Sequence, residues 1–315
     1  MKKLLMLILT GSLILSMAAC GGGTSGSSDD KTSGPAGKKV SILTPYLSSV
    51  TTNQMVDDMK AGMEKEGMVV NVVDTKGDFA QLASRIEDTV SSKADAIVLV
   101  SADPAQVATQ LQGAFDAGIP VFGCDSSFVD GMMVNATSDN KAMGEQITKY
   151  LFDDLMGGKG TVIALTYRPH PGVAKRCTAF DEILKQYPNI KLITEQTVEV
   201  PGPIENSRKI MENLILSNSA KDSITAVWCA WDEPAIGATQ ALQAAGRDEV
   251  LVVGVDGNSQ AIDLINQGTN LKATVAQNFE GMADIVVTEM TKMFNGEEIT
   301  KGDEYAPASI VTKEQ

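Results

Sequence analysis

The chain has 315 residues and a formal net charge of −14, from 26 basic and 40 acidic side chains. This length allows one large or two medium domains with a substantial core. The acidic balance argues against binding to nucleic acid and against direct adsorption to anionic lipid, since both need clustered positive charge.

The first twenty residues have the parts of a secretory signal in the usual order. Lys2 and Lys3 form a positive segment, an apolar stretch runs from Leu4 to Leu15, and small residues then lead into Cys20. The apolar stretch is too short for a comfortable transmembrane helix. The order resembles a bacterial lipoprotein signal. That resemblance implies a signal peptide over residues 1–19, acylation of the Cys20 thiol and a lipid anchor on the extracytoplasmic face of the cell membrane. The alternative is an ordinary signal peptide with an incidental cysteine.

Residues 20–37 continue from the cysteine as a Gly/Ser-rich segment with almost no apolar side chains. Such a segment cannot bury enough surface to fold, and it predicts a flexible tether.

Once the two lysines of the signal are removed, the chain has 24 basic and 40 acidic residues, a net charge of −16. The remaining cysteines, Cys124, Cys177 and Cys229, are widely spaced without a CxxC pair. We expect buried, reduced thiols and no metal site.

Beyond the tether, short apolar runs alternate with longer stretches of helical period, and the pattern restarts once. In the first half the predicted strands are 40–43, 69–73, 96–100, 120–123 and 132–135, and the predicted helices are 51–66, 79–93, 104–117 and 140–156. In the second half the predicted strands are 161–165, 191–194, 226–230, 251–255 and 273–276, and the predicted helices are 172–186, 204–218, 234–245, 259–267 and 279–294. Runs that are apolar throughout suit parallel strands covered on both faces. The sequence therefore predicts an α/β protein of two doubly wound halves.

In open parallel sheets, ligands bind beyond the carboxyl ends of the strands. The segments at those positions are markedly polar and include aromatic side chains that could stack on a ligand: 44–46, 74–78, 101–103, 125–127, 166–168, 231–233, 256–258 and 277–278.

Four motifs in these segments carry a family resemblance, and they occur in the family's order. They are GIPVFGCDS at 118–126, WDEPAIGATQALQAAG at 231–246, GVDGN at 254–258 and ATVAQN at 273–278. The chain from about Lys38 onward resembles the ribose-binding type of solute-binding protein, a type I periplasmic binding protein that serves an ABC importer. The resemblance implies two Rossmann-like lobes that close on a ligand by hinge motion. The first lobe would comprise 38–138 and 278–304, and the second 139–277 and 305–315, with crossovers near 138–140, 277–278 and 303–306.

The same resemblance implies a set of ligand-binding residues. Asp125 and Asp256 match family carboxylates that accept hydrogen bonds from sugar hydroxyls, Arg176 matches an arginine at the start of a helix, and Gln277 matches a glutamine beside the hinge. Carboxylates, arginine and glutamine make directional bonds to hydroxyl groups. Ser138 falls at the first crossover.

Four further positions differ from the family or stand at its aromatic positions. Tyr46 stands where the family has an aromatic residue, and Leu47 occupies the second aromatic position. Ser126 replaces an arginine, and Trp231 stands where the family places a ligand-binding asparagine. Fewer donors and a new indole imply a ligand other than ribose, such as a modified or less hydroxylated sugar.

Other interpretations of these residues stay open. Asp125 and Asp256 could cap helices or turns, Arg176 could pair with a surface acid, and Trp231 could be a core aromatic. We expect Trp228 in the core. We expect the only histidine, His170, to be a loop residue, because it has no partners for metal binding or acid–base chemistry.

No P-loop, GxSxG, HExxH or GxGxxG motif marks an enzyme, and adjacent Asp232 and Glu233 should diverge at a helix start. We therefore expect no catalytic residues and no cofactor. The expected function is capture of a sugar or sugar-like molecule by a monomer and its delivery to an ABC permease. The alternatives are a sensor that presents its closed form to a membrane receptor or kinase, or a binding protein for a non-sugar polar ligand.

Overall fold

The computed structural model describes residues 34–313, so the predicted signal peptide, Cys20 and most of the tether lie outside the described residues. The last residues assigned to the tether are bonded to the folded body. The Gly34 N–H donates to the Phe294 carbonyl at 3.0 Å, and the Gly37 N–H donates to the Gly67 carbonyl at 2.8 Å. Within 34–313, no helix is both long and apolar enough to cross a membrane.

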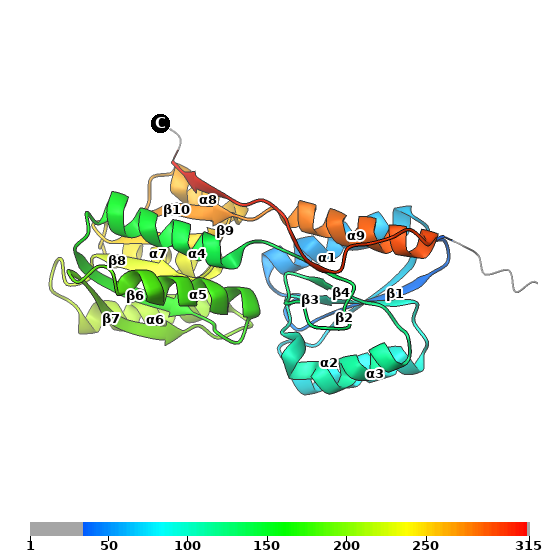
Figure 1. The fold of residues 1–315 in the computed structure, drawn as a ribbon. Coiled ribbons are helices and arrows are strands. Elements are labelled where there is room, and N and C mark those ends of the chain that lie inside the picture. Colours follow the sequence, from blue (N-terminus) through cyan, green and yellow to red (C-terminus); the bar gives the residue numbers. More distant parts are fainter. Residues whose placement is uncertain (1–33, 314–315) are drawn as a thin grey trace, which may run out of the picture. The chain divides into compact units, whose positions relative to one another are not determined.

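The first sheet has the strand order β2-β1-β3-β4-β5-β11, and all its neighbouring strands are parallel. Its strands are β1 Lys39–Thr44, β2 Val69–Asp74, β3 Ala96–Val100, β4 Val121–Cys124, β5 Val134–Thr137 and β11 Gly302–Tyr305. Helices α1 Val50–Lys65 and α9 Phe279–Asn295 cover one face, and α2 Phe79–Ser91 and α3 Ala108–Asp116 cover the other (Figure 1). A separate apolar cluster fills each interface. Burial on both faces explains why β3 is apolar throughout.

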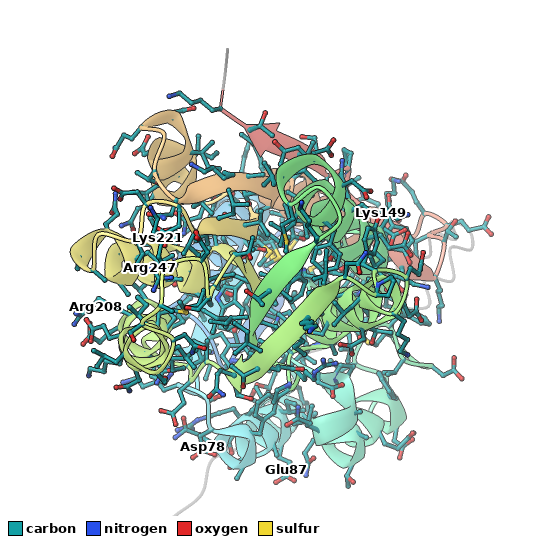
Figure 2. All side chains as sticks on the ribbon, turned by 90° about the vertical axis from the view of Figure 1, so that its left-hand side faces the viewer. Asp78, Glu87, Lys149, Arg208, Lys221 and Arg247 are labelled. Atoms are coloured by element: carbon teal, nitrogen blue, oxygen red, sulfur yellow. The ribbon has the colours of Figure 1, made fainter. Side chains whose placement is uncertain are left out.

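The second sheet has the order β7-β6-β8-β9-β10-β12. Its strands are β6 Gly160–Thr166, β7 Ile190–Thr197, β8 Ala226–Cys229, β9 Leu251–Asp256, β10 Leu271–Ala276 and β12 Ser309–Thr312. Its helices are α4 Asn140–Lys149, continued as a π-helical segment Tyr150–Leu155, then α5 Pro171–Leu184, α6 Pro203–Ser217, α7 Asp232–Ala244 and α8 Ser259–Asn266. Only β12 runs antiparallel to its neighbour. Figure 2 looks onto this part of the molecule and shows charged side chains such as Arg208 at its periphery.

The chain passes between the two sheets three times: after β5, after β10 and after β11. We call the elements around the first sheet, including α9, the first lobe, and those around the second sheet the second lobe. Helix α9 packs with α1 in the core of the first lobe, although it follows a strand of the second lobe. Within each sheet, the strands among β1 to β10 run parallel to one another, so their carboxyl ends gather at one edge of each sheet.

The prediction of an α/β fold with two doubly wound halves is confirmed, and all ten predicted strands are present as β1 to β10. Some details differ. The strand predicted at 132–135 begins at Val134, and the helix predicted at 104–117 starts with a 3-10 turn, Pro104–Val107, capped by Asp103. Strand β2 is half exposed because it lies at a sheet edge, where one neighbour is missing. The strands β11 and β12 were not predicted.

Candidate ligand-binding site

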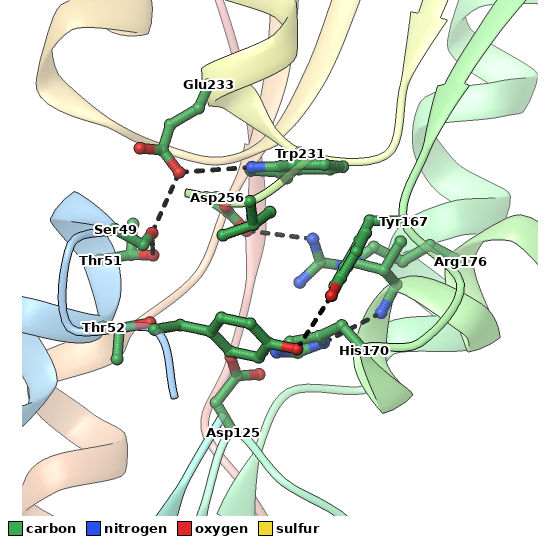
Figure 3. Close-up of a pocket in the computed structure, with 13 residues that line it drawn as sticks. Ser49, Thr51, Thr52, Asp125, Tyr167, His170, Arg176, Trp231, Glu233 and Asp256 are labelled. Carbon is green, nitrogen blue, oxygen red and sulfur yellow. Dashed lines mark hydrogen bonds and ion pairs between the residues drawn. The ribbon is translucent and has the colours of Figure 1, made fainter. Parts of the chain in front are cut away.

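A pocket lies where the two lobes meet. It contains about 490 Å³ that protein atoms do not fill, part of which is open to solvent. The first lobe contributes residues that follow β1 and β4 or that begin α1. The second lobe contributes residues that follow β6, β7 and β8, the last residue of β9, and residues of α5 (Figure 3). The lining residues are Tyr46, Ser49, Thr51, Thr52, Asp125, Tyr167, His170, Val173, Arg176, Val200, Trp231, Glu233 and Asp256.

Arg176 anchors a polar network in the second lobe and is only 2% exposed. Its Nη1 donates to Asp256 Oδ1 at 3.1 Å and to the Ala230 carbonyl at 2.9 Å, and its Nε donates to Asn140 Oδ1 at 2.8 Å. The glycine at position 144 of α4 allows Arg176 to lie here, because a Cβ on residue 144 would lie only 2.7 Å from the backbone of Arg176. The missing side chain lets α4 and α5 pack closely and brings the guanidinium to the strand ends.

Asp256 is held from two sides. Besides the Arg176 bond, its Oδ1 accepts from Gln277 Nε2 at 2.8 Å. Burial raises the pKa of Asp256, and the Arg176 charge and the Gln277 bond offset this only in part. The buried pair thus has the hydrogen bonds that a charge needs away from water.

Asp232 and Glu233 diverge, as expected at a helix start. Asp232 is fully buried away from the pocket, where its Oδ2 accepts from the Asn258 N–H at 2.8 Å. Burial and the nearby Asp256 charge raise the pKa of Asp232 to about 7. Glu233 lines the pocket instead, and its Oε2 accepts from the Ser49 hydroxyl of the first lobe at 3.0 Å and from Trp231 Nε1 at 3.3 Å.

Asp125 is the carboxylate that the first lobe contributes. Its backbone has a φ of +50°, in the left-handed region, which turns the chain directly after β4. Its Oδ2 accepts from the Ser101 hydroxyl at 3.2 Å and lies 3.4 Å from His170 Nε2 across the pocket, while its buried Oδ1 has no partner within 34–313. Burial raises the pKa of Asp125, but His170, Arg176 and the Ser101 bond outweigh it, so the pKa is lowered.

Three aromatic rings form the apolar walls. The Tyr46 and Tyr167 hydroxyls lie 3.2 Å apart, one from each lobe, and their ring centroids are 6.1 Å apart at 87°. Tyr167 and Trp231 also meet edge to face, with centroids at 6.4 Å. Burial, followed by the Tyr167 bond, raises the pKa of Tyr46 far above its usual value, so its hydroxyl stays protonated.

The structure brings five of the eight predicted ligand residues into the pocket lining: Tyr46, Asp125, Arg176, Trp231 and Asp256. The other three are not among the lining residues. Ser126 is buried and donates its hydroxyl to the Ala102 carbonyl. Ser138 is buried in the first crossover, and Gln277 supports Asp256. Ligand contact by the eight stays a prediction.

Several pocket residues were not predicted from the sequence: Tyr167, His170, Glu233, and the hydroxyl residues Ser49, Thr51 and Thr52 at the start of α1. His170 is the clearest case, because it was expected to be only a loop residue. Its Nδ1 accepts from the Gly172 and Val173 N–H groups at 3.1 and 3.4 Å, so it caps α5 with its ring turned into the pocket. Its place directly before Pro171, between β6 and α5, was the available signal.

The core predictions agree with the structure. Trp228 is fully buried, and Cys124, Cys177 and Cys229 are buried free thiols. Among the described residues, no group of three or more metal-ligating side chains is arranged to hold an ion.

Residues 40–298 match the family model described as periplasmic binding protein domain. The chain is 32% identical over 255 residues to a D-apiose import binding protein of Actinobacillus succinogenes, covering 80% of this chain and 81% of that one. It is 30% identical over 309 residues to the ribose import binding protein of Bacillus subtilis, covering 96% of each.

A solved structure is similar as well. An ABC transporter solute-binding protein from Agrobacterium vitis, with bound allitol, superposes with a TM-score of 0.82 at 28% identity, covering 88% of this chain and 96% of that chain. The predicted type I periplasmic binding protein fold is thereby confirmed, as is the prediction of a binding protein instead of an enzyme. The chain belongs to the periplasmic binding protein family, as a sugar-binding component of ABC importers.

Proposed function

We propose that this protein captures a sugar or polyol in the pocket between its lobes and delivers it to the permease of an ABC importer. The observation that carries the proposal is the buried Arg176–Asp256 pair, which lines the same pocket as the aromatic rings of Tyr46 and Trp231. Charged groups fix hydroxyls by directional bonds, and aromatic faces cover the C–H surface of a sugar. The relatives named above bind or import ribose, apiose and allitol, which supports a ligand of this size and class.

In this proposal the ligand lies between Tyr46 and Trp231. Asp125 bonds it from the first lobe, and Arg176 and Asp256 bond it from the second. Gln277 and Ser126 also make contacts within the protein, to Asp256 and to the Ala102 carbonyl, and ligand contact by these two residues and by Ser138 stays part of the proposal.

A screen by thermal shift tests the proposal. The panel contains D-ribose, D-apiose, D-allose, xylitol, ribitol and allitol, with amino acids as a control class. Because ligand binds only the folded state, stabilisation is about 2.7 kcal/mol at a hundredfold excess over Kd. We expect at least one sugar or polyol to stabilise the protein. Stabilisation by amino acids alone would contradict the proposal.

Capture should work by hinge closure, because the ligand gains contacts from both lobes only when they meet. Scattering with the stabilising sugar should show a smaller radius of gyration than without it. An unchanged radius with proven binding would refute closure.

We further propose that Cys20 carries a lipid that holds the protein to the extracytoplasmic face of the membrane. Wild type should partition with membranes, whereas Cys20→Ala should block acylation. Residues 34–315 alone should stay in solution and still bind sugar, since residues 34–37 bond to the body. Membrane partitioning of Cys20→Ala equal to wild type would contradict the anchor.

A further inference from the structure

Asp232 is a buried carboxyl group that does not line the sugar pocket. It begins α7 and is fully buried. Its Oδ1 has no hydrogen-bond partner among the described residues, and no ion pair within 34–313 includes this side chain. A buried carboxylate without a cation is costly, and the neutral acid avoids most of this cost. The geometry therefore favours a protonated Asp232.

Asp232 holds the chain on both sides of Asp256. Its Oδ2 accepts the N–H of Asn258, two residues after Asp256, at 2.8 Å. Its Oδ1 lies against Gly254, two residues before Asp256, where it occupies the space that a Cβ would need. Asp256 has a φ of +130°, which strains any residue other than glycine. Asp232 thus holds a strained turn, and this turn presents Asp256 to Arg176 and to the pocket.

Asp232 and Asp256 repel one another when both are charged. Burial, and next the Asp256 charge, raise the pKa of Asp232 to about 7, and the hydrogen bonds that Asp232 accepts offset this only in part. On β8, burial and the Asp232 charge raise the pKa of the Cys229 thiol. On α7, burial is the main cause that raises the pKa of Glu233. Arg176 of α5 is already bonded to Asp256.

A bound sugar would strengthen the repulsion between these two carboxylates. The sugar excludes water from Asp256, and like charges repel more strongly when less water surrounds them. A proton on Asp232 removes one of the two charges. The protonated form should therefore bind the sugar more tightly and, because linkage is reciprocal, sugar binding should tighten the hold on the proton.

We propose that Asp232 is the positioning residue of Asp256 and that sugar binding is linked to the proton on Asp232. The neutral acid holds the turn between β9 and α8 and leaves Asp256 as the charged member of the pair. The affinity for the sugar falls as the pH rises and the proton is lost. This inference rests on the proposed function and adds a pH regulation of the same site.

The test is calorimetry on the full chain, purified in mild detergent, at pH 5.5, 7 and 8.5, with the best-stabilising sugar of the panel above. The affinity of wild type should fall tenfold or more from pH 5.5 to 8.5. Asp232→Asn keeps the size of the side chain and an acceptor for the Asn258 N–H, but it carries no charge. Its affinity should fall no more than threefold over the same range, and at pH 8.5 it should bind more tightly than wild type.

Two further variants separate the proton from the positioning role. Asp232→Ala lacks the acceptor for the Asn258 N–H, so it should bind more weakly than Asp232→Asn at every pH. Asp263→Asn is the matched control, because Asp263 is an exposed aspartate of α8, and it should keep the pH profile of wild type. Glu233 and His170 of the pocket are unchanged in all three variants, so the difference from wild type reports on Asp232.

Proton uptake can also be measured on wild type alone, which keeps the proposal testable if Asp232→Asn does not fold. Calorimetry at pH 7.5 in phosphate and in Tris, whose ionisation enthalpies differ, gives the number of protons bound with the sugar. We expect net uptake of protons. Binding without proton uptake would refute the link.

Two outcomes of the pH series overturn the proposal in different ways. If a sugar binds with the same pH profile in wild type and Asp232→Asn, the proposed function stands and the proton link is wrong. If no sugar of the panel binds at any of these pH values, the proposed function itself fails and the proton link with it.

Discussion

The two lobes have sheets of the same strand order, but they hold their pocket residues in different ways. In the second lobe, Arg176, Asp256 and Gln277 are already bonded to one another and to the backbone. In the first lobe, Asp125 keeps one carboxylate oxygen unpartnered, and its neighbours in the pocket are hydroxyl side chains. We propose from this comparison that the second lobe presents a preformed binding surface and that the first lobe completes the site when the lobes close.

The edges of the sheets differ as well. Strand β11 runs parallel to β5, toward the crossovers. The chain then enters the second lobe running away from them, so β12 must lie antiparallel to β10. The last crossover thus joins two edge strands and ties both sheets to a single extended segment.

The largest effect should come from breaking the preformed network. Arg176→Met leaves Asp256 buried without its charge partner, which typically costs about 3–5 kcal/mol. We expect at least a hundredfold loss of affinity for the best sugar of the panel, measured by calorimetry, together with a lower Tm. Arg208→Met is the control, because Arg208 forms exposed ion pairs with Glu205 and Glu212 (Figure 2). Sugar binding by Arg176→Met within threefold of wild type would contradict the role of the second lobe.

Asp232→Asn should change the pH dependence of stability. With a folded pKa of about 7 and an unfolded pKa near 3.9, the folded protein holds a proton that the unfolded chain has lost between these pH values. The free energy of unfolding therefore falls as pH rises from about 4 to about 7.

Asn at position 232 can still accept from the Asn258 N–H but carries no charge. The variant should be more stable above pH 7, by up to about 4 kcal/mol, and should show a flatter pH slope. Asp256 and Glu233, whose pKa values are also raised, keep part of the slope. Denaturant unfolding at pH 4.5 and 8 checks this. Equal slopes in the variant and wild type would show that Asp232 is not the titrating group.

Asp125→Asn tests the first lobe alone. The substitution replaces the carboxylate with a neutral amide of about the same size. We therefore expect roughly a tenfold loss of affinity for the sugar, a smaller loss than for Arg176→Met. Asp130→Asn, outside the pocket, should bind like wild type. If Asp125→Asn lost more affinity than Arg176→Met, the first lobe and not the second would supply the main binding surface.

Tyr46→Phe should have the smallest effect. It removes the hydroxyl that meets Tyr167 across the lobes and keeps the ring. The loss should be about 0.5–1.5 kcal/mol, or no more than about tenfold in affinity. Calorimetry on Tyr46→Ala and Tyr46→Phe separates the contribution of the ring from that of the hydroxyl. If Tyr46→Ala has the same affinity for the sugar as Tyr46→Phe, the ring does not contact the ligand.

The sequence predicted the repetitive parts of the fold because apolar runs at strand spacing signal burial on both faces. It could not predict β11, whose residues Gly302, Asp303 and Glu304 are polar and whose strand character comes from pairing with β5. At the site, Glu233 and Asp232 could be expected to diverge, but not which one faces the ligand. Gly254 decides this, since its missing side chain leaves the room that Asp232 fills.

The central claim is that the pocket between the lobes is the sugar site. A crystal structure of the full chain with the best-stabilising sugar of the panel tests it most directly. We expect the sugar to lie between Tyr46 and Trp231, within hydrogen-bond distance of Asp125, Arg176 and Asp256. A sugar bound elsewhere, with this pocket holding only water, would contradict it.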